Sequence, residues 1–242
     1  MAPITQQQQD ALCRGVEAVR RRMDAALAAA CRAPGEVLLC AASKTRDADT
    51  VAFAAGLAID LFGENHVQEL VQKSAAGAYG AKPCHMIGHL QTNKIRQAVG
   101  CGMIQSVDRE KLILGIEAEA AKRGVCQDIL LEVNIGGEAS KSGATAGALD
   151  ALLELAAGCA HLRLRGLMTI PPPAESEGQA RQYFAAVRAL YERLAPHCPA
   201  SARWDTLSMG MSDDFAAAIA EGATMVRVGT GIFGPRQYPK AT

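Results

Sequence analysis

The chain has 242 residues, and its 25 Lys plus Arg balance 25 Asp plus Glu, so the formal charge is zero. A neutral chain has no net field to attract nucleic acid or an anionic membrane, and an aromatic content of 4% argues against base-stacking surfaces. The hydrophobic content of 49% supports a sizeable core and excludes disordered and low-complexity classes.

The pattern of apolar residues divides the chain into one long helix followed by alternating short elements. Residues 5–32 carry apolar side chains at three- and four-residue steps, which predicts an amphipathic helix that Ala33-Pro34-Gly35 ends. Short apolar runs then predict strands at 37–43, 61–63, 85–88, 103–107, 128–134, 162–170, 206–210 and 224–229. Helical patterns between them cover 48–58, 65–75, 92–99, 109–123, 145–157, 177–195 and 212–221, and a turn is expected at 232–236.

Eight strands alternating with seven helices predict an α/β fold, a (β/α)8 TIM barrel with an extra N-terminal helix. An open doubly wound sheet is the alternative. Because no linker interrupts the alternation, we expect one domain over 1–242, with the helix at about 5–32 and the barrel at about 36–236.

Eight cysteines occur, and no two lie within four residues of each other, so no CxxC motif is present. The first residues have no apolar signal core, and no run approaches the roughly 18 apolar residues of a membrane helix. We therefore expect reduced, mostly structural thiols and a cytoplasmic protein. The scattered histidines and the lack of a carboxylate cluster argue against a metal centre.

The carboxyl ends of barrel strands meet at one mouth, where barrel enzymes build their sites. Polar or flexible residues stand at the predicted ends. In strand order they are Ser43-Lys44-Thr45, Gly63-Glu64-Asn65, Gly88-His89, Ser106 and Asp108, Asn134, Met168-Thr169, Ser208 to Ser212, and Arg227 with Gly229-Thr230.

Lys44 is the one lysine of eight that directly ends a long apolar strand. Desolvation and the nearby charge of Arg227 would lower its amine pKa, which favours Schiff-base formation with an aldehyde. The alternative is a lysine that reaches solvent or pairs with a carboxylate.

The loops after the last two predicted strands have the features of a phosphate site. Ser212 is an N-cap type residue before a helix, and Gly229-Thr230-Gly231 permits close backbone approach and adds a hydroxyl. A capping serine and an ordinary glycine turn are the alternative. Arg227, out of step with its valine neighbours, either points inward to a partner or ligand or outward to a helix carboxylate. His85 and His89 flank Gly88, and either could be a hydrogen-bonded wall residue.

Ordered motifs over roughly residues 10–236 resemble one known family. They are AASKT (41–45), GENHVQE (63–69), HMIGHLQTNK (85–94), SVD (106–108), VNIGGEASKSG (133–143), RGLMTIP (165–171), LSMGMSDD (207–214) and VRVGTGIFG (226–234). The sequence resembles the pyridoxal phosphate homeostasis proteins, which are single-barrel relatives of the alanine racemase N-terminal domain. It departs from the family at His66, where Tyr is usual, and at Cys84 and Met86, where Trp and Phe are usual.

The resemblance implies a site for pyridoxal 5′-phosphate (PLP). Lys44 would form the Schiff base, Asn65 and His89 would line the ring, and Arg227 would face the pyridine nitrogen. The phosphate would be held by Ser208, Ser212, Gly229 and Thr230. Met168 and Met209, at the ends of the sixth and seventh strands, are also expected to contact the cofactor.

The related racemases carry a C-terminal β-domain, and in them a tyrosine of the partner subunit acts as the second base. This sequence ends after the predicted barrel, and none of its tyrosines (79, 183, 191 and 238) stands at a predicted strand end. We therefore expect a monomeric PLP carrier that acts in homeostasis or delivery to PLP-requiring apoenzymes, not an enzyme. The alternatives are a weak PLP-dependent racemase or lyase, and a PLP-free barrel enzyme acting through a Schiff base or on sugar phosphates.

Overall fold

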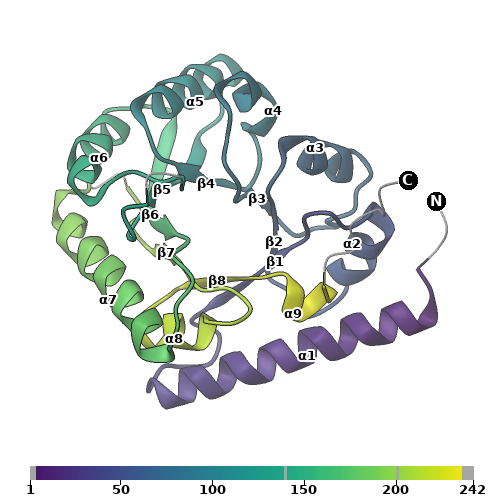
Figure 1. Ribbon diagram of the computed structural model, residues 1–242. Coiled ribbons are helices and arrows are strands. Elements are labelled where there is room, and N and C mark those ends of the chain that lie inside the picture. Colours follow the sequence, from purple (N-terminus) through teal and green to yellow (C-terminus); the bar gives the residue numbers. More distant parts are fainter. Residues whose placement is uncertain (1–3, 139–140, 200–201, 236–242) are drawn as a thin grey trace.

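The computed structural model describes residues 4–138, 141–199 and 202–235. Eight parallel strands form a closed barrel in sequence order, with β8 pairing back onto β1 (Figure 1). The strands are β1 Leu38–Ala42, β2 Leu61–Glu64, β3 Cys84–Met86, β4 Met103–Val107, β5 Gln127–Val133, β6 Leu162–Thr169, β7 Thr206–Ser208 and β8 Met225–Val228. The predicted barrel is confirmed, and the β1–β8 pairing excludes the open sheet.

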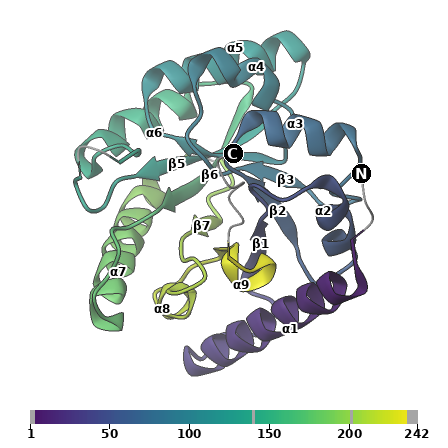
Figure 2. The same cartoon turned by 45° about the vertical axis from the view of Figure 1, so that its right-hand side comes forward.

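Helices surround the barrel and connect successive strands (Figure 2). They are α1 Gln6–Ala29, α2 Ala48–Ala55, α3 Val67–Ala75, α4 Ile95–Ala98, α5 Glu110–Arg123, α6 Leu149–Ala157, α7 Glu177–Leu194, α8 Phe215–Ala220 and α9 Thr230–Phe233. Short 3-10 turns, η1 Thr92–Lys94, η2 Ala146–Ala148 and η3 Ala195–His197, adjoin α4, α6 and α7. The single-domain division stays a prediction.

Five predicted strands are longer than the observed ones, and the third and seventh end early in a way that affects the site. The third ends at Met86 and the seventh at Ser208, although apolar residues continue the run in both places. After β7 the chain turns at Gly210, whose φ of +92° leaves the extended conformation, and α8 begins only at Phe215. Of the turn expected at 232–236, Ile232 and Phe233 form the end of α9, Gly234 and Pro235 follow that helix, and residue 236 lies outside the described ranges.

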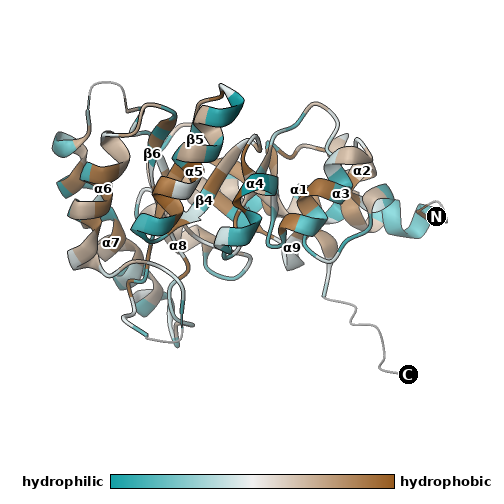
Figure 3. Ribbon diagram, turned by 90° about the horizontal axis from the view of Figure 1, so that it is seen from above, coloured by the Kyte–Doolittle hydropathy of each residue, from teal (hydrophilic) through white to brown (hydrophobic). Residues whose placement is uncertain are grey.

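Side chains of each strand alternate between the barrel interior and the layer beneath the helices. On β5, Ile129 and Leu131 belong to the large core between barrel and helices, whereas Leu130 packs with Met103 and Met168 in a separate inner cluster. Figure 3 shows hydrophobic strands inside a shell of helices that carry both hydrophobic and hydrophilic residues. The core is thus two layers, and polar inner residues face the barrel axis.

Helix α1 packs beside α8 and α9 at the side of the barrel where β8 ends (Figure 1). A Cβ at Gly15 of α1 would lie 2.7 Å from the carbonyl oxygen of Ile232, so glycine allows the two backbones to meet. Val16 and Val19 of the same helix are buried. Consequently α1 supports the short helix that follows the last strand.

Candidate functional site

A pocket of about 180 Å³ opens at the carboxyl ends of the strands. Six of the ten residues predicted from the sequence line it: Lys44, Asn65, Ser212, Arg227, Gly229 and Thr230. The other lining residues are Ala42, Arg46, Ile87, Ile170, Met211, Asp213, Phe233 and Gly234. The pocket therefore brings one amine, two guanidinium groups and two hydroxyls into one space.

Lys44 reaches this pocket because it follows β1, the strand that closes the barrel. The register pairs Cys40 of β1 with Arg227 of β8, so the chain leaving β1 lies beside the chain leaving β8. A Cβ at Gly229 would come within 3.3 Å of the carbonyl oxygen of Ala42, which shows how closely the two strand ends approach. The amine of Lys44 and the turn after β8 therefore share one wall.

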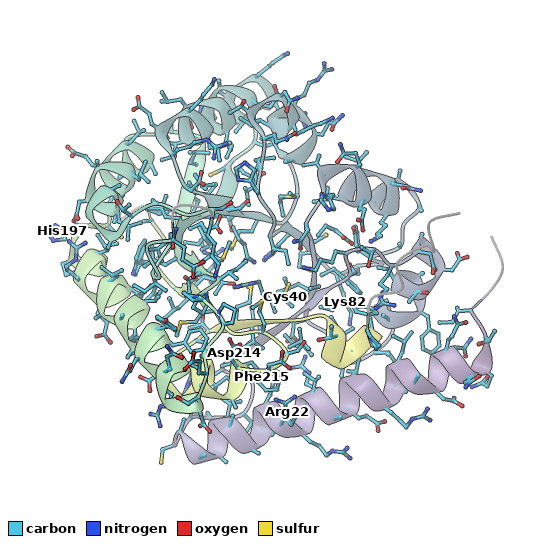
Figure 4. All side chains as sticks on the ribbon, in the orientation of Figure 1. Arg22, Cys40, Lys82, His197, Asp214 and Phe215 are labelled. Carbon is cyan, nitrogen blue, oxygen red and sulfur yellow. The ribbon has the colours of Figure 1, made fainter. Side chains whose placement is uncertain are left out.

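The turn after β8 and the loop after β7 meet at one end of the pocket. The amide of Gly231 donates to Ser212 Oγ at 3.2 Å, and this bond joins the two segments. From α1, Arg22 donates to the carbonyl oxygen of Ser212 at 3.2 Å and lies 4.4 Å from the ring centroid of Phe215 (Figure 4). This end of the pocket presents hydroxyls and backbone amides, which are groups suited to an anion.

Arg227 points into the barrel, which decides between the two orientations left open by the sequence. It is 4% exposed, and it donates to Ser208 Oγ and to the carbonyl oxygen of Thr169, both at 2.7 Å. Burial lowers its pKa, and the buried carboxyl of Glu132 acts in the opposite direction. A guanidinium keeps its charge in proteins, so a fixed cation lies at the floor of the pocket.

A chain of hydrogen bonds continues from Arg227 across the barrel interior. Ser208 Oγ donates to Gln105 Oε1 at 2.7 Å, and Gln105 Nε2 lies 2.8 Å from His85 Nδ1. Burial lowers the pKa of His85 to about 4, so the imidazole is neutral and accepts from the amide. His85 is thus a hydrogen-bonded interior residue, and the chain orients Arg227 from below.

Four predicted site residues do not line this pocket. Ser208 is fully buried beneath Arg227, Met168 lies in the inner apolar cluster, and Met209 lies in the core under the helices. His89 is exposed, 3.3 Å from Ser142 Oγ, and lines a neighbouring hollow with Asn65. Strand β7 ends before Met209 and β3 ends before His89, so neither side chain follows the alternation that the longer predicted strands would impose.

Arg46 and Phe233 are two of the eight lining residues that the sequence did not assign to the site. The Arg46 guanidinium lies 5.8 Å from the Phe233 ring centroid and donates to the carbonyl oxygens of Gly234 and Pro235 at 2.8 and 3.0 Å. Arg46 stands only two residues after Lys44, and this spacing was the available signal. The pair ties the loop after β1 to the end of α9.

The cysteines and the acidic groups show no further centre within the described residues. All eight cysteines lie there, none in a disulfide, and burial raises the pKa of Cys40, inside the ring of strands, to about 12 (Figure 4). In the described ranges no three His, Cys, Asp or Glu side chains are placed to hold a metal ion. None of the helices described there is long and apolar enough to cross a bilayer.

Glu132 is a buried carboxyl on the inner side of β5. It is 5% exposed, and its Oε2 atom has no hydrogen-bond partner among the described residues. Burial first, and then the charge of Asp108, raises its pKa to about 7, although Arg227 opposes the shift. The folded protein therefore resists ionisation of this group until near-neutral pH.

We expect Glu132→Gln to stabilise the protein at alkaline pH and to leave it nearly unchanged at pH 4. Below pH 4.5, the pKa of Glu132 in the unfolded protein, the carboxyl is protonated in both the folded and the unfolded protein. Between pH 4.5 and about 7 the carboxyl ionises only in the unfolded protein. The free energy of unfolding of the wild type therefore falls by about 3 kcal/mol across this range. Urea unfolding at pH 4 and pH 8 measures the difference. Glu154→Gln, at an exposed position, is the control. An equal effect of Glu132→Gln at both pH values would contradict this assignment.

Comparisons with known proteins agree with the geometry. Residues 16–237 match the family model of the alanine racemase N-terminal domain. The chain is 38% identical over 234 residues to the pyridoxal phosphate homeostasis protein of Aquifex aeolicus, covering 93% of this chain and 99% of that one. It is 41% identical over 232 residues to the protein of the same name from Escherichia coli K12, covering 92% and 95%.

A solved structure is also similar. It is PipY of Synechococcus elongatus with PLP bound, at 33% identity and a TM-score of 0.77, and the match covers 88% of this chain and 100% of PipY.

Proposed function

The chain belongs to the pyridoxal phosphate homeostasis protein family, and on that premise we propose that it binds PLP in the pocket at the barrel mouth, as a Schiff base on Lys44. We propose further that the bound PLP is held in reserve for, or delivered to, enzymes that require it. The observation that carries the proposal is that Lys44 shares one pocket with the hydroxyls and amides that follow β7 and β8.

The described residues fit the chemical groups of PLP. The aldehyde of PLP forms a Schiff base with an amine, and Lys44 supplies that amine. A phosphate needs hydrogen-bond donors, and Ser212, Thr230 and the backbone at Gly229 offer them at the end of the pocket that follows β7 and β8. A Cβ at Gly229 would already press on Ala42, so glycine keeps this end open to the backbone.

Arg227 is proposed to face the pyridine nitrogen from the pocket floor. PLP can serve as an electron sink when bound, and it does so best when its ring nitrogen is protonated. A permanent cation beside that nitrogen disfavours protonation, so the ring would withdraw electrons weakly. Ser208 holds Arg227 rather than lining the pocket, and we propose it as a supporting residue, not a phosphate ligand.

Binding without catalysis is proposed because of the residue types that line the pocket. Racemisation needs an acid and a base on opposite faces of the substrate carbon. Among the described residues that line the pocket there is no Tyr, His or Cys, and the single carboxylate, Asp213, is exposed. Tyr79 is buried elsewhere, and Tyr238 lies outside the described ranges.

Lys44→Ala is expected to abolish the visible Schiff-base absorbance that PLP produces with the wild-type protein. Borohydride reduction followed by peptide mapping should place the label on the wild-type peptide containing Ser43-Lys44-Thr45. Lys94→Ala, in the neighbouring hollow, is the matched control and should keep band and label. A label at Lys141 instead would refute the site, and steady turnover of an amino acid would favour a racemase or lyase.

Ser212→Ala and Ser208→Ala are expected to have different effects. Ser212→Ala should weaken PLP binding by about 10- to 100-fold while changing the affinity for pyridoxal little, because only PLP carries the phosphate. Ser208→Ala removes a partner from a buried cation and should lower the free energy of unfolding by about 1–3 kcal/mol. Binding titrations measure the affinities for PLP and pyridoxal, and urea unfolding measures the free energy of unfolding. The assignment fails if Ser208→Ala changes the PLP-to-pyridoxal affinity ratio more than Ser212→Ala does.

A further inference from the structure

We propose that Glu69 and Lys73 of α3 are positioning residues for Lys44, because their ion pair holds the peptide groups on both sides of it. The inference rests on the proposed Schiff base at Lys44. Neither Glu69 nor Lys73 lines the pocket.

The contacts flank Lys44 on both sides along the chain. Lys73 Nζ donates to the carbonyl oxygen of Ser43 at 2.8 Å, and the amide of Thr45 donates to Glu69 Oε2 at 2.7 Å. The two helix side chains meet each other at 2.9 Å. One ion pair on α3 therefore fixes the residue before Lys44 and the residue after it.

A second carboxyl anchors this pair to the barrel. Glu64, at the end of β2, is fully buried, and its Oε1 accepts from Lys73 Nζ at 2.8 Å and from Ser43 Oγ at 2.6 Å. Tyr79 OH donates to the same oxygen at 3.2 Å. Lys73 is itself buried, with 5% of its side chain exposed. Buried charges that hold each other and satisfy several hydrogen bonds have little freedom to move.

The backbone next to Lys44 has a conformation that needs such support. Thr45 has a φ of +65°, in the left-handed region, where a β-branched residue is disfavoured by about 1–3 kcal/mol. Without the bond from its amide to Glu69, the chain would relax toward ordinary φ values. The direction in which the Lys44 side chain leaves the backbone would then change.

Positioning matters for bond formation more than for simple binding. An amine must approach the aldehyde carbon within a narrow range of distance and angle, and a misplacement of about 1 Å can cost on the order of 100-fold in rate. The phosphate end of the pocket is built from the loop after β7, the turn after β8 and α9, and it does not include α3. Loss of the hydrogen bond from the Thr45 amide to Glu69 should therefore slow Schiff-base formation and leave phosphate-directed affinity intact.

The test compares Glu69→Ala with Glu69→Gln. Alanine removes the acceptor for the Thr45 amide, whereas glutamine keeps an oxygen for it and loses only the charge. The rate of Schiff-base formation is followed by stopped-flow absorbance at saturating PLP, and the affinity for pyridoxine 5′-phosphate, which lacks the aldehyde, is measured separately. We expect Glu69→Ala to slow the reaction by about 10- to 100-fold with an affinity within about threefold of wild type, and Glu69→Gln to recover most of the rate.

Glu119→Ala is the matched control. Glu119 forms a comparable ion pair with Arg123 four residues later, on α5, and neither residue lines the pocket. Glu119→Ala should leave both the rate of Schiff-base formation and the affinity for pyridoxine 5′-phosphate unchanged. If Glu69→Ala does not fold, Glu69→Ser, whose side chain is too short to reach the Thr45 amide, takes its place.

Two results would overturn the positioning role. One is a wild-type rate in Glu69→Ala; the other is a proportional loss of rate and pyridoxine 5′-phosphate affinity, which a general structural defect would produce. Neither result contradicts the proposed Schiff base at Lys44. If instead the wild-type protein forms no reducible adduct at Lys44, the proposed function itself fails.

Discussion

The pairing of β1 with β8 is the contact on which the rest of the site depends. It closes the sheet, and its register sets Cys40 opposite Arg227. Lys44 leaves the first strand of the barrel and Thr230 follows the last, so residues far apart in sequence become neighbours only through this pairing. Because all strands are parallel, every strand end contributes to one mouth. Helix α1, packed against α8 and α9, supports the side of the barrel where the ring closes.

Two separate networks of buried charge lie next to the pocket among the described residues. Inside the barrel, Arg227 is held by Ser208, which is held by Gln105, and this chain fixes a cation at the pocket floor. Outside the ring, Lys73 and Glu64 form a buried pair beside the end of β1. Removing one partner of such a pair is costly because the other charge remains buried. The first network holds the Arg227 side chain, and the second holds the peptide groups on both sides of Lys44. Rigid support of this kind is what a site for covalent capture requires.

Apolar runs predicted the barrel because parallel strands are buried on both faces and are separated by amphipathic helices. The same runs located Lys44 and Arg227, since the side chain that ends a strand stands at the mouth. Hydrophobicity does not show where hydrogen-bonded pairing stops, so the predicted seventh strand runs to Gly210 whereas β7 ends at Ser208. The family resemblance implies that Ser208 holds the phosphate, but its side chain lies beneath the pocket. The spacing of Glu69 and Lys73 is visible in the sequence, but it is typical of a solvated helix pair. Only the folded chain brings that pair to the peptide groups around Lys44.

The central claim is that Lys44 and the segments after β7 and β8 hold the two ends of one PLP molecule. A crystal structure of the protein with PLP tests it most directly. The account predicts continuous electron density from Lys44 Nζ to the aldehyde carbon, with the phosphate beside Ser212 and Thr230 and the pyridine nitrogen facing Arg227. Density that joins PLP to another lysine, or a phosphate bound away from these two segments, would contradict it.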